Sequence, residues 1–469
     1  MITINYRSVE INYNQIDFGN LTEIMANLMI RNFSTKDRIF YAATDWSKST
    51  DKSERIESKP GCIIASPTFP CKPIPKSITD QDYVFHWVRD AAISIMELGY
   101  FKDKYTSYIE DYVDFSRLIQ TNAIEAKKTN YSCFRVDGTL RDGTRKYSFL
   151  DYSEENIWNQ QNDGCPLRII SLIELKSIMT QSYQDKSLEI IKQDIDTILG
   201  CYKGTTEKNI WEEVGGESFF VKSVQLEALK KVLNNNIYIS EKKKIQDAID
   251  YLTKSISKHW NDEKKHYISI INPIYDNDNQ KDKVKDSIDL NSDIIMASIY
   301  GSIDVMDSQM MSSACKVLEE ISKYKINEYD QRRGIGPLIG RYPNDVYDGN
   351  NADNEEDKGI PWVPCTSVLA EYFYRVAYKI KKQRSFEIND DNRGFYNLAE
   401  INDNKDFTNA IDKLIKKGDK MLQAIIYHSD HLELSEQIDP ILGYEQNVKN
   451  LTWSYASFLS AVRARKRVK

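Results

Sequence analysis

Apolar residues recur along most of the chain at the spacing of amphipathic helices. In "DKYTSYIEDYVDFSRLIQTNAI" (103–124) and "WVPCTSVLAEYFYRVAYKI" (362–380) they fall at i, i+3, i+4 and i+7. This pattern and helix-start residues predict twelve helices, which begin near Asn20, Asp90, Lys104, Asn156, Ser187, Glu217, Ser240, Leu290, Asp307, Pro361, Asp406 and Asn447.

Strand-like segments are short and few: "GCIIASP" (61–67), "SCFRV" (132–136) and "HYISII" (266–271). Polar stretches at 276–289, 350–358 and 384–405 have the composition of surface loops, and no fixed-period repeat is present. The pattern therefore predicts one large all-α domain with short hairpins among its connecting loops.

Composition narrows the class of protein. The 469 residues are 41% hydrophobic and 28% charged, which is ordinary for a globular chain. A net charge of −7 argues against a nucleic-acid partner, whose binding surface would be basic. The 29 Tyr and 7 Trp are residues that fill cores and also line carbohydrate grooves.

The seven cysteines include no CxxC pair and are odd in number, so we expect buried thiols rather than a disulfide framework. We expect no metal and no cofactor. The chain shows no signal peptide and no apolar run long enough for a bilayer, so we expect no membrane partner. Its location stays open between the cytoplasm and export without a cleavable signal, and we expect a monomer.

The stretch "NIWEEVGGESFF" (209–220) places Glu212 and Glu213 side by side among apolar and aromatic residues. Burial of a carboxylate raises its pKa unless a partner compensates, and a raised pKa suits a general acid. The alternative is a helix start with both acids facing solvent.

Other segments share this character, since each combines an aromatic residue with charged or amide residues ahead of a helix. Sugars need flat apolar faces for stacking and polar partners for their hydroxyls. The segments are "DYVFHWVRDAAI" (82–93), "IWNQQNDGCPLR" (157–168), "GRYPNDVYDG" (340–349), "LSEQIDP" (434–440) and "NLTWSYA" (450–456).

Taken in order, these motifs resemble those of the glucoamylases, the inverting exo-glucosidases of glycoside hydrolase family fifteen, from about residue 60 to 465. The resemblance implies an (α/α)6 barrel of six inner and six outer helices, with loops at one end that form a glucose-sized pocket. It divides the chain into an N-terminal extension packed on the barrel (1–60) and a catalytic domain (61–469).

The resemblance also implies catalytic roles. Glu212 is the general acid, and Glu436 is the general base that activates a water. Inversion requires about 6.5–9.5 Å between the two carboxyls. We expect apolar surroundings to raise the pKa of Glu212, and polar groups to keep Glu436 ionised. Glu213 then binds a hydroxyl of the leaving sugar.

The remaining site residues follow from the same motifs. Arg89 and Asp90 match the family's residues that grip the terminal glucose, and Arg341 resembles the arginine that lies between the first two sugar sites. Asn209 stands where the family has Asp, which we expect to tune rather than abolish activity, and the 350–358 insertion is expected to shape the rim. The predicted substrate-binding set is Tyr83, Trp87, Arg89, Asp90, Trp158, Asn209, Ile210, Trp211, Glu213, Arg341 and Trp453.

The sequence predicts hydrolysis of α-1,4-glucans such as starch, glycogen or maltooligosaccharides from their non-reducing ends. Two alternatives stay open: a related barrel hydrolase that acts on isomaltose-, dextran- or trehalose-type substrates, and a catalytically silent glucan-binding protein. Trp87 and Trp362 fit packing as well as binding.

Overall fold

Six helices form a closed inner ring in the computed structural model, which describes residues 18–43, 55–68, 83–141, 160–275, 280–347 and 359–469. Each inner helix contacts the next, and the last contacts the first. The ring consists of α2 (Val88–Leu98), α4 (Gly164–Leu175), α6 (Phe219–Asn234), α9 (Asp293–Ile299), α12 (Val363–Gln383) and α15 (Thr452–Val468).

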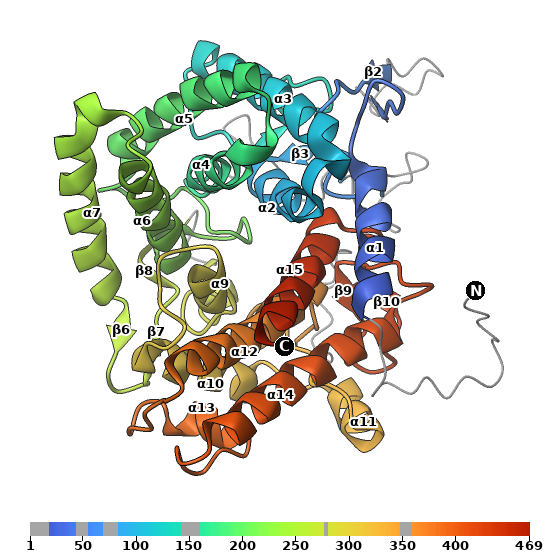
Figure 1. The fold of residues 1–469 in the computed structure, drawn as a ribbon, viewed down its shortest axis with the longest axis vertical. Coiled ribbons are helices and arrows are strands. Elements are labelled where there is room, and N and C mark those ends of the chain that lie inside the picture. The colour runs from blue at the N-terminus through green and yellow to red at the C-terminus, as the bar shows by residue number, and fades with distance from the viewer. Residues whose placement is uncertain (1–17, 44–54, 69–82, 142–159, 276–279, 348–358) are drawn as a thin grey trace.

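Every inner helix contacts one outer helix (Figure 1). The outer partners, in the same order, are α3 (Thr106–Glu125), α5 (Gln181–Cys201), α7 (Lys242–Ser257), α10 (Ser308–Glu320), α14 (Phe407–His428) and α1 (Phe18–Met29). This arrangement confirms the predicted all-α (α/α)6 barrel.

The two rings differ in how their side chains are buried. All residues of α15 from Thr452 to Val462 are buried, as expected for a helix enclosed on every side. In α7, by contrast, one stripe from Ile245 to Ile256 is buried and the remaining face is polar. Hydrophobic burial of these stripes and of the inner ring supplies the main driving force for the fold.

Shorter elements fill the connections. They include helices α8 (Gln280–Val284), α11 (Lys325–Arg333) and α13 (Arg393–Leu398), and 3-10 turns η2 (Ile30–Asn32), η3 (Gly99–Tyr105), η5 (Lys176–Ile178) and η6 (Ile239–Glu241). The strands of the described residues pair antiparallel, two by two: β1 (Tyr41–Ala43) with β2 (Arg55–Glu57), β3 (His86–Trp87) with β4 (Cys133–Phe134), β5 (Gly215–Ser218) with β8 (Ile270–Ile274), β6 (Trp260–Asn261) with β7 (His266–Tyr267), and β9 (Gln437–Ile438) with β10 (Glu445–Gln446).

Most helices begin within about three residues of their predicted starts. Helix α5 begins earlier than predicted, at Gln181, because Ser187 is no cap: it is buried within the helix and its hydroxyl donates to Met179 Sδ at 3.4 Å. Helix α15 begins later, at Thr452, because Asn447 has a positive φ of 61°. The predicted strand at 61–67 is reduced to a single bridge between Ile63 and Phe33.

The predicted 1–60 extension contains α1, which packs against α15; its boundary at residue 60 stays a prediction. Trp158 and the 350–358 insertion lie outside the described residues. Among the residues that are described, no helix combines the length and apolarity required to cross a bilayer.

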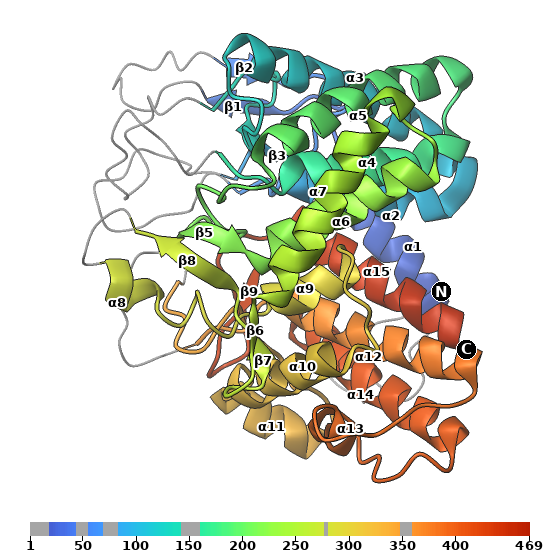
Figure 2. The same ribbon diagram turned by 90° about the vertical axis from the view of Figure 1, so that its left-hand side faces the viewer.

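The ends of the barrel differ. Strands β3, β5, β8 and β9 gather at one end, whereas the C-terminus of α15 lies at the other (Figure 2). Strands β3, β5 and β9 lie in the segments that lead into inner helices α2, α6 and α15. The motifs predicted to carry chemistry lie in these segments and in those leading into α4 and α12, so the fold collects them at one end.

Candidate active site

Glu212 and Glu213 lie in a tight turn ahead of β5. Asn209 N–H donates to Val214 O at 2.7 Å, and Glu212 N–H donates to Asn209 O at 3.0 Å. Glu212 has a φ of 65°, a conformation that costs energy for a residue with a Cβ. The helix-start alternative is wrong because α6 begins only at Phe219. The turn, not helical geometry, separates the two acids.

Asn209 holds this turn together. Its Oδ1 accepts hydrogen bonds from the backbone N–H of Trp211 (3.2 Å) and of Glu213 (3.0 Å), and its side chain is fully buried. Ile210 beside it belongs to the hydrophobic core and is 2% exposed. Both residues therefore shape the loop from beneath, and an Asp at position 209 would offer the same acceptor.

Two donors reach one oxygen of Glu212. Trp87 Nε1–H donates to Oε1 at 2.8 Å, and Gln161 Nε2–H donates to the same atom at 3.0 Å. An oxygen that accepts two hydrogen bonds is a poor place for a proton. When the carboxyl is protonated, its hydrogen therefore belongs on Oε2.

Arg89 organises the neighbouring buried acids. Its Nη1 donates to Gln161 Oε1 (2.6 Å) and to Asp163 Oδ2 (3.0 Å), and its Nε lies 3.2 Å from Asp90 Oδ2. Burial raises the pKa of Asp90 to about 6. The positive charge of Arg89 opposes this rise, but the negative charges of Glu212 and Asp163 partly offset the effect of Arg89. Arg89 thus contacts Asp90 directly, and it positions Gln161 against Glu212.

Glu213 is held from three sides. Tyr342 Oη donates to its Oε1 at 2.6 Å, Ser287 Oγ donates to its Oε2 at 2.7 Å, and Arg341 Nη2 lies 3.0 Å from Oε1. Burial raises the pKa of Glu213 and Arg341 opposes that rise. Arg341 is itself fixed by two hydrogen bonds of 2.7 Å to Asp345.

Glu436, just before β9, is 5% exposed. Asn447 Nδ2 and the hydroxyl of Tyr83 donate to its carboxyl, and the positive charge of Arg341 acts to lower its pKa. Burial together with the charges of Asp90 and Glu212 nevertheless raises the pKa of Glu436 to about 8. The prediction that polar groups keep Glu436 ionised is therefore wrong for the free protein, because desolvation outweighs them.

Aromatic rings enclose these acids. Trp211 stacks on Trp453 with ring centres 6.0 Å apart and tilts against Trp362 at 5.5 Å. On the other side, the hydroxyls of Tyr83 and Tyr347 are 3.0 Å apart. The guanidinium of Arg341 lies 4.8 Å from the centre of Trp362, and that of Arg89 lies 5.7 Å from Trp453. The rings thus connect the two arginine clusters.

A site with several buried acids, two anchored arginines and aromatic walls is typical of carbohydrate hydrolysis. The model of the glycosyl hydrolases family 15 matches residues 48–463 of the chain. The chain belongs to this family.

Known proteins that are similar to this chain are glucoamylases, in agreement with its membership of family 15. A glucoamylase of Saccharomycopsis fibuligera is 27% identical over 463 residues, covering 87% of this chain and 85% of the relative. The intracellular sporulation-specific glucoamylase of Saccharomyces cerevisiae is 25% identical, covering 87% and 79%. A solved Saccharomycopsis fibuligera glucoamylase has a TM-score of 0.73 at 22% identity, covering 99% of this chain and 98% of that one. The protein is a glucoamylase-type glycoside hydrolase.

Several residues of this family 15 site were absent from the predicted set. Gln161 and Tyr342 lie inside quoted motifs, so their contacts to Glu212 and Glu213 could have been expected. Ser287 lies in a polar loop, and only the fold reveals its contact. The further additions are Asp163, Asp345, Tyr347, Asn447 and Asn291, whose Oδ1 accepts a hydrogen bond from Trp211 Nε1–H at 2.9 Å. Within the described part of the chain, no three His, Cys, Asp or Glu side chains gather to hold a metal ion.

Proposed function

We propose that this family 15 protein is an inverting exo-hydrolase that releases glucose from the non-reducing ends of α-1,4-glucans such as starch, glycogen and maltooligosaccharides. The glucoamylase names of its relatives support this substrate class. One observation carries the assignment. Glu212 and Glu436 come from loops far apart in the sequence, and each is held by its own donors, yet they are close enough to interact electrostatically.

Glu212 acts as the general acid. Its Oε1 is occupied by Trp87 and Gln161, so Oε2 carries the proton to the glycosidic oxygen as the bond breaks. The same two donors then stabilise the carboxylate that remains, because hydrogen bonds to a charged acceptor are stronger than those to a neutral one.

Glu436 acts as the general base toward a water on the opposite face of the sugar. Its pKa of about 8 belongs to the free site with Glu212 and Asp90 both negative. In the reactive form the proton lies on Glu212, which removes one of these two charges and favours the ionised form of Glu436. An oxocarbenium-like transition state brings positive charge next to these carboxylates. That charge favours the ionised form of Glu436 at the stage where a base is needed.

Arg89 and Asp90 position the terminal glucose. In the described residues, Arg89 Nε and Asp90 Oδ2 lie 3.2 Å apart without completing a hydrogen bond to any protein group. Buried groups of this kind recover their lost hydration when sugar hydroxyls reach them. Stacking of the sugar ring on Trp453 would add an apolar contact to these hydrogen bonds and so strengthen binding of the terminal glucose.

The test is the Glu212→Gln variant with maltotriose as substrate. Loss of a working general acid lowers kcat by about 10²–10⁴ or more. Glu207→Gln is the matched control, because Glu207 is an exposed acid on the same loop. A parent without activity, or a Glu212→Gln variant that turns over like the control, would refute the assignment.

A further inference from the structure

Polar side chains line the interior of the barrel below the active site. Helix α2 carries Ser94 and Glu97 after Asp90, and α12 carries Ser367 and Glu371 at helical spacing, all of them buried. A closed core between helices is normally apolar, since buried polar groups are costly without partners. This column of polar groups therefore requires an explanation.

Tyr300 joins the column from the end of α9. Its hydroxyl lies within hydrogen-bonding reach of Ser457 and Trp453 of α15, and it interacts electrostatically with Glu371 of α12 and Glu97 of α2. One hydroxyl thus faces groups from three other inner helices, which places the column within the ring rather than between the two rings.

Three polar atoms of the column lack a hydrogen-bond partner among the described residues. They are Ser94 Oγ, Ser367 Oγ and Glu371 Oε2. All three residues are 0% exposed. Native proteins satisfy nearly all such groups, and ordered water does so where the protein cannot.

The column has two defined ends. At the top, Asp90 and Trp453 belong to the active site. At the bottom, Arg463 donates to Glu97 at 2.6 Å and 3.1 Å, and Arg375 lies 2.6 Å from Glu371 Oε1. The side chains of these arginines are 19% and 33% exposed. On α2, the seven residues from Asp90 to Glu97 span about 10 Å.

We propose that ordered water molecules fill this column and connect the floor of the active site with solvent at the opposite end of the barrel. Each of the three unpartnered atoms is a hydrogen-bonding site for this water. This role rests on the proposed exo-action. When a glucose unit enters a pocket that is closed at its far end, the displaced water leaves through the column along the barrel axis instead of past the sugar, so the column acts as a drain.

The direct test needs no activity, so its outcome is independent of the proposed function. A high-resolution crystal structure of the whole protein should contain water within hydrogen-bond distance of Ser94 Oγ, Ser367 Oγ and Glu371 Oε2. An interior in which these atoms bond to one another, or which holds no water density, would overturn the proposal.

A kinetic test examines the drain. Ser367→Val places an apolar branched side chain in the column, and we expect it to slow glucose association, followed by tryptophan fluorescence in stopped flow, at least threefold. Tyr300→Phe adds no bulk and should slow association in the same direction. Ser171→Ala on α4 is the control, because its hydroxyl already donates to Arg168 O at 2.9 Å. Unchanged association in both column variants would refute the drain.

Discussion

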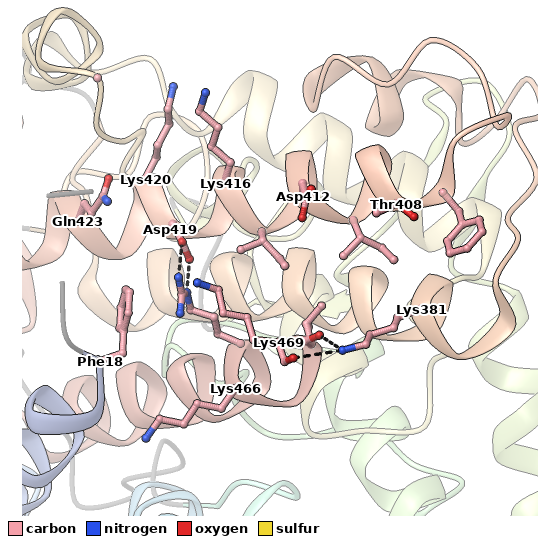
Figure 3. A pocket seen from close by; sticks show the side chains of 16 residues that line it. Phe18, Lys381, Thr408, Asp412, Lys416, Asp419, Lys420, Gln423, Lys466 and Lys469 are labelled. Atoms are coloured by element: carbon pink, nitrogen blue, oxygen red, sulfur yellow. Dashed lines mark hydrogen bonds and ion pairs between the residues drawn. The ribbon is translucent and has the colours of Figure 1, made fainter. Parts of the chain in front are cut away.

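The active site and the groove between α14 and α15 both contain charged side chains, but their charges are arranged differently. The groove encloses about 900 Å³ and is lined by lysines that point in different directions (Figure 3). Its Asp419 is fully paired, with Arg465 Nη2 and Tyr374 Oη each at 2.7 Å. In the active site, by contrast, Asp90 and Glu436 are buried with raised pKa values.

The comparison shows that a hollow with charged walls is not by itself a catalytic site. Asp419 of the groove is neutralised by a dedicated cation, Arg465, and therefore serves a structural role. The acids of the active site share two arginines, repel one another and retain the capacity to exchange protons near neutral pH. Perturbed acids in a crowded cluster are a better indicator of chemistry than volume.

The largest predicted difference between the regions is catalytic. Glu436→Gln should lower kcat on maltotriose by about 10³ or more, because the attacking water loses its base. Asp419→Asn should leave kcat within about twofold, while removal of one partner of a partly buried ion pair lowers the free energy of unfolding by about 2 kcal/mol. A strong loss of kcat in Asp419→Asn would break the comparison.

Substitution of Glu436 should raise the free energy of unfolding, whereas Asp419→Asn lowers it. Its folded pKa of about 8 exceeds the ordinary value of 4.5, so the folded state keeps a proton that the unfolded chain releases. Through this group, the parent loses stability as the pH rises from about 4.5 to 8.

Glu436→Gln does not titrate, so it should exceed the parent in unfolding free energy by a few kcal/mol above pH 8, since each pKa unit is worth about 1.4 kcal/mol. Urea denaturation between pH 4 and 9 measures the difference, which should vanish near pH 4.5. A pH-independent difference would show that burial of the charge is not its cause.

Removal of one donor from Glu212 should have a smaller effect. Trp87→Phe keeps an aromatic ring but loses the 2.8 Å hydrogen bond to Oε1. We expect kcat to fall about tenfold, in line with a charge-assisted hydrogen bond of about 1.5 kcal/mol, with little change in KM. Steady-state kinetics on maltotriose would decide, and a change confined to KM would assign Trp87 to substrate binding instead.

The smallest effect is expected at Asn209. Asn209→Asp keeps the oxygen that accepts from Trp211 N–H and Glu213 N–H, so activity should stay within a few-fold of the parent. Asn209→Ala loses both bonds and should lower both kcat and the melting temperature. Equal activity in the two variants would mean that the turn does not depend on this side chain.

Much of this architecture could be predicted from the sequence, because helical periodicity is local. The stripe of α7 and the buried run of α12 are visible in the residues themselves. Motif order predicted the family, and with it the residues Arg89, Glu212 and Arg341. The positive φ of Glu212 could not be predicted, since nothing in "NIWEEVGG" distinguishes a turn from a helix start.

The electrostatics of the site were also beyond the sequence. The pKa of Glu436 depends on Asp90 and Glu212, which lie hundreds of residues away in the chain and become neighbours only in the folded barrel. The contact of Ser287 with Glu213 has the same origin. Both the pKa shift and the contact depend on which residues become neighbours in the folded protein, and the residue types alone do not determine this.

The stereochemistry of the first turnover tests the central claim most directly. Maltotriose is mixed with the protein, and the anomeric proton of the released glucose is followed by NMR before mutarotation equilibrates it. A general acid and a general base that act across one water give β-glucose first. Initial release of α-glucose would contradict the roles of Glu212 and Glu436.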